Sequence, residues 1–251
     1  CDKILNHTEF VPIKEFRHRQ LPHPYNKDKM FDNLVTALGK LVVKITFKGT
    51  SPNRPDIGLV ELQTTDEMVG SGNIIFSEVK EISRFCRCPC RGCKTNPVEY
   101  WGEIKIRTAA HVVCDDIEAS RAECLMYYDS ENSDVIKLQG IRVSQMSRQY
   151  DTAEIICVTH DVNLADNLMY MIYDYKDCHT RLYERYLTEG VNDLVILISH
   201  PHGYSKHVTI GKNTQREVLR KLRSDIGYVK NYYDNHSCPG SSGAPVYMLS
   251  K

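Results

Sequence analysis

The sequence predicts an all-β fold, arranged as a barrel or a sandwich. Three observations lead to this prediction. Short β-type runs recur along most of the 251 residues, turn residues separate the runs, and no strongly helical stretch alternates with them. A chain of this length can form one large all-β domain.

Composition indicates a folded protein and argues against two classes of partner. Hydrophobic residues make up 41% and charged residues 25% of the chain, which is enough for a real core. Lysine plus arginine and aspartate plus glutamate both number 32, so the net charge is zero. A general binder of nucleic acids or acidic membranes should be basic. We therefore expect no nucleic-acid partner. No apolar run approaches the ~20 residues that a membrane helix needs, so we expect no membrane partner either.

The N-terminal part predicts an extended leader, one helix and a first strand. Residues 1–30 are polar and contain Pro12, Pro22 and Pro24. Residues 27–41 have apolar side chains at helical spacing, and residues 41–49, "LVVKITFKG", are β-like. The loop "SPNRPD" follows. We group residues 1–65 as this N-terminal part.

Eight further β-type runs follow the loop. They are separated by turn residues, as in a barrel or sandwich. The stretch "LTEGVNDL", residues 187–194, marks a seam between two halves. The runs are residues 72–76, 103–113, 122–128, 134–143, 152–158, 193–199, 207–211 and 227–233.

The segment "HSCPGSSGAPVY", residues 236–247, gathers small and turn-forming residues in one place. A serine between glycines can occupy a tight turn in which backbone N–H groups point at one spot. That arrangement is what an oxyanion hole requires in acyl transfer. Gly240 allows a close approach of the backbone, and Ser242, followed by Gly243, would expose its hydroxyl.

A serine nucleophile needs a histidine base, and the base needs an orienting carboxylate. His111 stands at the end of the β-type run "RTAAHVV", after small residues that leave its ring room. Asp151 begins the apolar run "DTAEIICV". The three residues follow the order His, Asp, Ser, at intervals of 40 and 91 residues.

The segments "TAAHVV", "DTAEI" and "GSSGAPVY" resemble the three motifs of the trypsin-like (chymotrypsin-fold) serine proteases. "ISHPHGYSKHVTIG", from Ile198, resembles more specifically the intracellular trypsin-like peptidases. The resemblance covers about residues 66–251. It implies two antiparallel β-barrels with the catalytic groups in the cleft between them. Barrel one would extend to about residue 160, and barrel two would begin near residue 190.

The resemblance also implies a role for each site residue. Ser242 would be the nucleophile, His111 the general base and then the general acid, and Asp151 the residue that orients His111. The backbone N–H groups of Gly240 and Ser242 would form the oxyanion hole. His236 and Ser237 would lie at the base of the substrate pocket. This mechanism requires no cofactor for catalysis.

The sequence departs from the digestive enzymes of this family at several points. Ser241 stands where they carry an aspartate before the nucleophile, and Val112 stands where a cysteine follows the histidine. Because the pocket position His236 is not an aspartate, we do not expect a preference for lysine or arginine. The sequence ends nine residues after Ser242. The second barrel is therefore either truncated at the C-terminus or unusually short.

The stretch "FCRCPCRGC" contains four cysteines in eight residues: Cys86, Cys88, Cys90 and Cys93. Cys90 and Cys93 have the C-x₂-C spacing of a zinc knuckle. Four thiolates can hold a structural zinc, although the C-x-C steps are tight for a single ion. Disulfides, free thiols, or a zinc site completed by Cys114 or by a distant histidine are the alternatives.

Two further segments have ordinary interpretations. "HPHGYSKH" contains His200, His202 and His207, and we interpret it as a strand, a turn and a strand near the substrate cleft rather than as a metal site. "QREVLRKLRSD", residues 215–225, is basic and indicates a solvated loop or helix face.

Taken together, the motifs predict a serine endopeptidase that acts on proteins or peptides through an acyl-enzyme. A protease-fold module that is catalytically inactive and binds a protein partner is the alternative. Asn235 lies in a glycosylation sequon next to the Ser242 segment, where a glycan would be obstructive. This position favours a cytoplasmic protein over a secreted one. The sequence does not indicate an oligomeric state.

Overall fold

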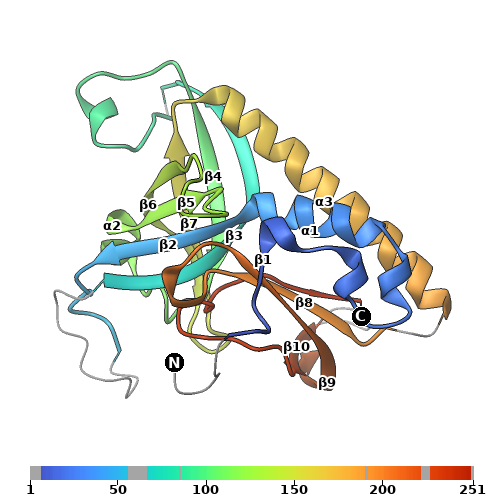
Figure 1. The fold of residues 1–251 in the computed structure, drawn as a ribbon. Coiled ribbons are helices and arrows are strands. Elements are labelled where there is room, and N and C mark those ends of the chain that lie inside the picture. Colours follow the sequence, from blue (N-terminus) through green and yellow to red (C-terminus); the bar gives the residue numbers. More distant parts are fainter. Residues whose placement is uncertain (1–6, 56–66, 85, 190–191, 222–226, 250–251) are drawn as a thin grey trace.

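The computed structural model describes residues 7–55, 67–84, 86–189, 192–221 and 227–249. Two antiparallel β-structures make up the molecule, and a long helix runs beside both (Figure 1). The prediction of an all-β fold built from two antiparallel β-barrels is confirmed in its class and in the direction of its strands. The first sheet is a closed barrel, and the second is open among the described residues.

The closed barrel contains six strands in the order β2-β3-β4-β7-β6-β5. It closes because β2 pairs with β3 on one side and with β5 on the other. Fully buried side chains such as Ile45, Ile104 and Ile155 fill its interior. The strands are β2 (Val42–Lys48), β3 (Glu67–Glu81), β4 (Tyr100–Thr108), β5 (Glu123–Met126), β6 (Ile136–Ser147) and β7 (Thr152–Thr159).

Strand β2 is an integral member of this barrel, although the sequence analysis placed it in the N-terminal part, 1–65. Its residues alternate between buried and less buried positions, and they face β3 in register from Val42–Asn73 to Lys48–Glu67. A division at residue 65 therefore cuts through the barrel. The physical unit begins at or before Val42.

The second sheet has the order β1-β9-β8-β11, with β10 paired to β9. Every residue of β8 is buried, which explains the unbroken apolar run "LVILIS". The bounds are β1 (Val11–Pro12), β8 (Leu194–Ser199), β9 (His207–Lys221), β10 (Gly227–Tyr233) and β11 (Val246–Met248).

The α-helices are α1 (Met30–Leu41), α2 (Asp116–Arg121) and α3 (Val162–Glu189). Short 3₁₀ turns occupy Ile13–Glu15, His18–Gln20, Tyr25–Lys27, Gly92–Lys94 and Pro201–Gly203. Helix α1 lies where the apolar spacing of residues 27–41 predicted a helix. No described helix is both long enough and apolar enough to span a membrane.

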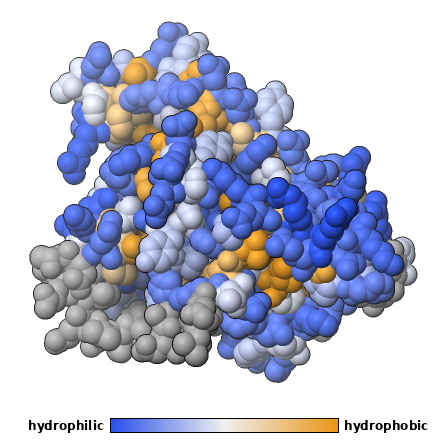
Figure 2. Space-filling model, viewed as in Figure 1, coloured by the Kyte–Doolittle hydropathy of each residue, from blue (hydrophilic) through white to orange (hydrophobic). Residues whose placement is uncertain are grey.

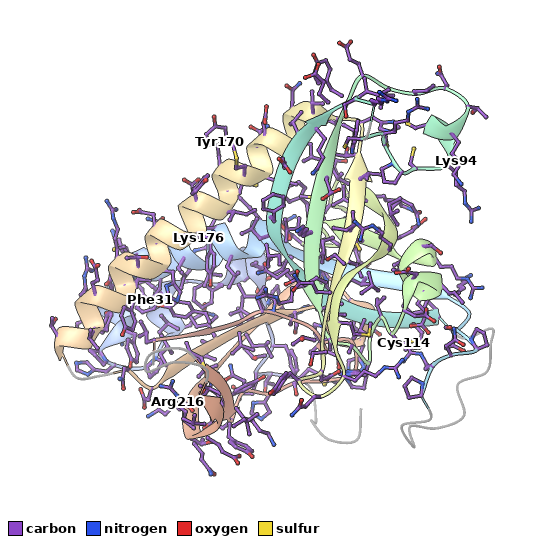
Figure 3. The ribbon with its side chains drawn as sticks, turned by 180° about the vertical axis from the view of Figure 1, so that it is seen from behind. Phe31, Lys94, Cys114, Tyr170, Lys176 and Arg216 are labelled. Atoms are coloured by element: carbon purple, nitrogen blue, oxygen red, sulfur yellow. The ribbon has the colours of Figure 1, made fainter. Side chains whose placement is uncertain are left out.

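Helix α3 is the largest element that the sequence analysis missed. Its 28 residues contain many polar side chains, so the apolar stripe is narrow and easily overlooked. The first half packs Leu164 and Leu168 against the barrel core, whereas Leu182 and Tyr186 join the core under the second sheet. The helix thereby ties the two β-structures together, with Tyr170 on its outer side (Figure 3).

The basic stretch 215–225 is a strand over its described part, not the loop or helix face that the charge pattern indicated. Residues up to Lys221 belong to β9 and pair with β10, with Arg216 opposite Asn231 and Val218 opposite Val229. Residues 222–226 lie outside the described ranges. Pairing with the strand formed by "GYVKNYY" stabilises the extended conformation here, although the local charge pattern favoured a loop or a helix. Arg216 marks this hairpin in Figure 3.

Lys206 fastens the second sheet to the barrel side of the molecule. Its ammonium group is fully buried and donates hydrogen bonds to the Gly39 carbonyl at 2.5 Å and to Asp129 at 2.8 Å. Burial lowers the pKa of Lys206, whereas the Asp129 carboxylate opposes that shift by favouring the charged form. A buried charge with two partners is costly to break, so this contact fixes α1 relative to β9.

The two-core role of α3 predicts a large effect at Leu182, which is 0% exposed. Leu182→Ala should lower the free energy of unfolding by about 2–5 kcal/mol, because it leaves a cavity beneath the second sheet. Tyr170→Ala is the control on the same helix. Its side chain is 62% exposed, and the change should stay within about 0.5 kcal/mol. Urea unfolding measures both, and equal effects would contradict the packing described for α3.

Candidate active site

His111 and Asp151 meet at one end of the barrel. Strands β4 and β7 are paired with Thr108 opposite Ala153, so the turn after β4 and the turn before β7 lie side by side. His111 Nδ1 is 2.6 Å from Asp151 Oδ2, and the His111 backbone N–H donates to Asp151 Oδ1 at 3.0 Å. The Asp151 carboxylate therefore contacts both the ring and the backbone N–H of His111.

The Asp151 carboxylate is aimed by an unusual backbone conformation. Its φ angle is +50°, in the left-handed region, where aspartate and asparagine are the best tolerated residues after glycine. The side chains of His111 and Asp151 are 35% and 52% exposed, so solvent reaches the pair. They also line a cavity of about 200 Å³ together with Arg54, Ala110 and Arg148, among others.

A buried ion pair supports the His111 turn from behind. The Arg54 guanidinium bonds Glu118 through Nε at 2.8 Å and through Nη2 at 2.6 Å. It also donates to the backbone carbonyls of His111 at 2.8 Å and Val112 at 3.0 Å. A planar fork of donors suits this task, because it can hold a carboxylate and a backbone turn at once.

Glu118 accepts hydrogen bonds from the backbone N–H groups of Ser51 and Cys114 as well. Burial alone would raise the pKa of Glu118, but the Arg54 and N–H bonds outweigh it and hold that pKa below its ordinary value. The neighbouring Cys114 is buried, and burial, then Glu118, raises the pKa of its thiol to about 12. Cys114 is therefore a structural thiol and not a reactive one.

The Ser242 segment depends on two glycines in the left-handed region. Gly240 has φ +91° and Gly243 has φ +81°. A Cβ at Gly240 would lie 2.5 Å from the His200 carbonyl oxygen, and a Cβ at Gly243 would overlap Thr108 Oγ1 and the Ser71 carbonyl oxygen. Both positions therefore require glycine. The contact with Thr108 also places the Ser242 segment beside the strand end that leads into His111.

One buried side chain holds this segment against the barrel. Ser71, on β3, donates its hydroxyl to the Gly240 carbonyl at 2.8 Å, and its backbone N–H donates to the Ser242 carbonyl at 2.8 Å. The hydroxyl also accepts from the His200 backbone N–H at 2.9 Å, and Thr108 Oγ1 donates to the Ser71 carbonyl at 2.7 Å. Barrel, segment and the end of β8 therefore meet at Ser71.

Ser241, where the digestive enzymes carry an aspartate, is buried and faces inward. Its hydroxyl lies 3.0 Å from Ser199 Oγ and accepts from the Cys238 backbone N–H at 3.4 Å. Ser242 is half-buried, and its hydroxyl bonds no described residue. Within the described ranges, His111 Nε2 and the N–H groups of Gly240 and Ser242 have no protein hydrogen-bond partner either.

The other predicted site residues are placed as follows. His236 and Ser237 are exposed on the segment before Ser242. The Asn235 amide is buried and donates to the Val195 and Thr209 carbonyls, so a glycan on this nitrogen would break the anchor of the segment. Cys88, Cys90 and Cys93 cluster with His160, and Cys86 lies outside that cluster.

The histidine-rich stretch is a strand, a turn and a strand, as expected. His200 directly follows β8 in a buried position, and its Nδ1 lies 3.0 Å from the Tyr204 carbonyl oxygen. His202 faces His7, with a nitrogen-to-nitrogen distance of 3.2 Å, and His207 begins β9. The three rings have different partners, so they do not form one metal site together.

Sequence reasoning missed Arg54, Glu118 and Ser71. Arg54 falls in "SPNRPD", which the sequence shows only as a loop, and Ser71 is one small residue in a strand. The signal that could have indicated Arg54 is a charged residue between two prolines shortly after a barrel strand. No comparable signal exists for Ser71.

No family model and no curated protein matches the chain. Solved structures do match. The Rv3671c protease from M. tuberculosis in its active form is 14% identical with a TM-score of 0.44, and the match covers 91% of this chain and 73% of that one. The HtrA-type protease AlgW with tripeptide is 14% identical with a TM-score of 0.43 and coverages of 87% and 50%.

A serine endoprotease from Yersinia pestis is 14% identical with a TM-score of 0.41, and the match covers 87% of this chain and 53% of that one. The chain thus spans about half the length of the AlgW and Yersinia structures.

The Arg54–Glu118 pair predicts a strong coupling, because the two side chains are only 10% and 0% exposed. Arg54→Met should lower the free energy of unfolding by about 3–5 kcal/mol, since it leaves a buried carboxylate unpaired. Combining it with Glu118→Leu should cost less than the sum of the two single changes. Lys137→Met breaks an exposed ion pair with Glu123 and should change stability by less than about 1 kcal/mol. Additive single effects would rule out the supporting role.

The lowered pKa of the buried His200 side chain should make the folded protein less stable in acid. Burial, and then the positive charge of Lys206, lowers the pKa of His200 to about 3, against an ordinary value of about 6.5. Between these values the unfolded chain binds a proton that the folded protein does not. The free energy of unfolding should therefore fall by up to about 1.4 kcal/mol for each pH unit lost below about 6.5.

His200→Asn should flatten this slope, whereas His236→Asn leaves the buried imidazole in place and should keep it. Urea unfolding between pH 4 and pH 7 supplies the slopes. An unchanged slope in His200→Asn would show that another group causes the acid sensitivity.

Proposed function

We propose that the protein is a serine endopeptidase that hydrolyses peptide bonds through an acyl-enzyme. One observation carries the proposal. Asp151 holds the His111 ring through Nδ1, and Nε2 has no partner within the described part of the chain. The ring lies at the strand end that contacts the Ser242 segment. A base whose outer nitrogen is free beside an accessible hydroxyl is the arrangement that activates serine.

The proposed reaction follows from these groups. His111 Nε2 takes the proton of Ser242 Oγ as this oxygen attacks the substrate carbonyl carbon. The tetrahedral intermediate collapses when His111 returns the proton to the leaving amine, which gives an ester on Ser242. Water, deprotonated by His111, then attacks the ester, and the proton returns to Ser242 Oγ as the acid product leaves. Asp151 stays ionised and stabilises the charged imidazole.

The Ser242 segment supplies the oxyanion stabilisation in this proposal. The left-handed glycines Gly240 and Gly243 shape the turn, and the N–H groups of Gly240 and Ser242 have no acceptor among the residues that the structure describes. Preorganised N–H donors strengthen as charge develops on the carbonyl oxygen. The reaction requires no cofactor.

The substrate is a protein or peptide in this proposal. His236 and Ser237 lie exposed, six and five residues before Ser242, where they can meet a substrate side chain. Neither is acidic, so we expect no selectivity for lysine or arginine. The buried Asn235 amide supports a cytoplasmic location, because the sequon could not be glycosylated without releasing the segment.

A second candidate is a protease-fold module that binds a protein partner without catalysis. The observation that favours it is the lack of a hydrogen bond between the His111 ring and the Ser242 hydroxyl in the described residues. Catalytic hydrogen bonds are often long in the absence of substrate and tighten only in the complex. Chemical reactivity of Ser242 therefore decides between the two candidates.

A fluorophosphonate probe should label the parent protein at Ser242 and should not label Ser242→Ala. His111→Ala should reduce labelling strongly, since it removes the base. Ser237→Ala is the matched control, as it removes an exposed hydroxyl from the same segment and should label as the parent does. Undiminished labelling of Ser242→Ala would exclude this nucleophile, and an unreactive parent would favour the binding module.

A further inference from the structure

Three sulfurs and one ring nitrogen converge at the end of the barrel that carries the long β3–β4 loop. Cys88, Cys90 and Cys93 lie in this loop, and His160 follows the last residue of β7. His160 Nε2 is 3.5 Å from Cys88 Sγ, 3.6 Å from Cys90 Sγ and 3.3 Å from Cys93 Sγ. All four atoms lie within 4.8 Å of one another.

These separations are those of the corners of a zinc tetrahedron. Zinc binds cysteine sulfur at about 2.3 Å and histidine nitrogen at about 2.0–2.1 Å, so tetrahedral angles put sulfur and nitrogen about 3.5 Å apart. The three sulfur-to-nitrogen distances scatter around that value. We propose that Cys88, Cys90, Cys93 and His160 form a structural zinc site.

The local backbone is already shaped for a metal. Cys90 and Cys93 flank the residues Arg91 and Gly92, and the Cys93 backbone N–H donates to Cys90 Sγ at 3.4 Å. A hydrogen bond of this kind stabilises a thiolate, which is the form that binds metal. Arg87, Arg91 and Lys94 are exposed and stand next to the three cysteines in the sequence, so the loop itself is basic.

The surroundings close the site on one side. Cys88 and Cys93 are buried in a small apolar cluster with Trp101 and Val158. At the top of the face shown in Figure 2, apolar side chains gather near the base of the projecting loop. Four protein ligands leave no open position for substrate, so the site is structural.

The geometry favours zinc over disulfides. Three sulfurs meet around one nitrogen, and any single disulfide among them would leave the third sulfur and the histidine without a role. The site also differs from the four-cysteine set considered from the sequence, because His160 replaces Cys86. Cys114 does not complete it: Lys94, in the loop, and Cys114 lie well apart in Figure 3.

Such a link would add to the contacts that already hold the loop, which are the small cluster around Trp101 and a few backbone hydrogen bonds such as Ile82 N–H to the Glu99 carbonyl. Among the described residues between β3 and β4, one short 3₁₀ turn forms, Gly92–Lys94. Zinc would join the tip of this loop to the junction between β7 and α3, which starts at Val162. In the proposal the metal therefore orders the loop and leaves the His111 end of the barrel unchanged.

Metal analysis of the whole chain tests the proposal. Protein produced with zinc, then dialysed in reducing buffer, should contain one zinc per chain, and Co²⁺ in place of zinc should give the intense visible absorption of tetrahedral thiolate ligation. In the folded protein, Cys88, Cys90 and Cys93 should become open to thiol alkylation only after a chelator is added, whereas the buried Cys124 and Cys157 should stay unmodified throughout. A parent protein without a bound metal, or with disulfides among these cysteines in reducing buffer, would overturn the proposal.

Variants identify the ligands. Cys93→Ser and His160→Ala should each lose most of the bound zinc, and His160→Cys should retain it, since thiolate also binds zinc. Cys86→Ser is the matched control, as it removes a thiol from the same loop outside the cluster, and it should keep one zinc per chain. Loss of zinc in Cys86→Ser together with full retention in His160→Ala would establish the four-cysteine site instead.

A variant that fails to fold does not blur the result, because the parent protein gives a second measurement. Adding chelator to the folded parent should increase hydrogen exchange in residues 86–98 while the amides of β4 near Thr108 keep their protection. Exchange that stays the same in the loop would contradict its ordering by metal. Fluorophosphonate labelling of Ser242 is a separate readout, so failure of the zinc site and failure of the proposed catalysis are distinguishable.

Discussion

The position of the Ser242 segment relative to His111 depends on the hydrogen bonds of one buried hydroxyl, that of Ser71. The barrel carries the histidine and the aspartate, whereas the candidate nucleophile lies on a segment that leads into the second sheet. The Ser71 hydroxyl donates a hydrogen bond to the Gly240 carbonyl and accepts one from the His200 backbone N–H. It therefore links the barrel to the Ser242 segment and to the end of β8. Because the group is fully buried, an unmade bond there would cost about 1–3 kcal/mol, and the geometry is correspondingly fixed.

The strand pairing explains why distant parts of the sequence meet. Strand β7 starts directly after Asp151 and ends directly before His160. One end of this strand therefore presents the carboxylate that holds His111, and the other end presents the nitrogen of the proposed zinc site. Side chains of α3 join the cores of both β-structures, so the two β-structures are held together at a distance from the site as well as at Ser71.

Much of this arrangement could be predicted from the sequence, and the limits have physical causes. The β-type runs and helix α1 were predictable because period and turn residues are local signals. The His111–Asp151 pair was predictable because each residue stands in a recognisable motif, although the two are 40 residues apart. Helix α3 was missed because its narrow apolar stripe gains stability only from two cores that the sequence does not display. His160 and Arg54 were missed because their partners are 67 and 64 residues away in the chain. Ser71 could not be predicted at all, since a small polar residue in a strand has no distinguishing pattern.

The rate at which a fluorophosphonate inactivates Ser71→Ala tests the account most directly. Ser77→Ala is the control, because Ser77 is buried on the same strand and bonds the Ala165 carbonyl instead of the Ser242 segment. With both variants shown to be folded, Ser71→Ala should react at least about tenfold more slowly than the parent, a barrier increase of about 1.4 kcal/mol. Ser77→Ala should react at the parent rate. If Ser71→Ala reacts as fast as the parent, the segment does not need this hydroxyl to meet His111, and the account fails.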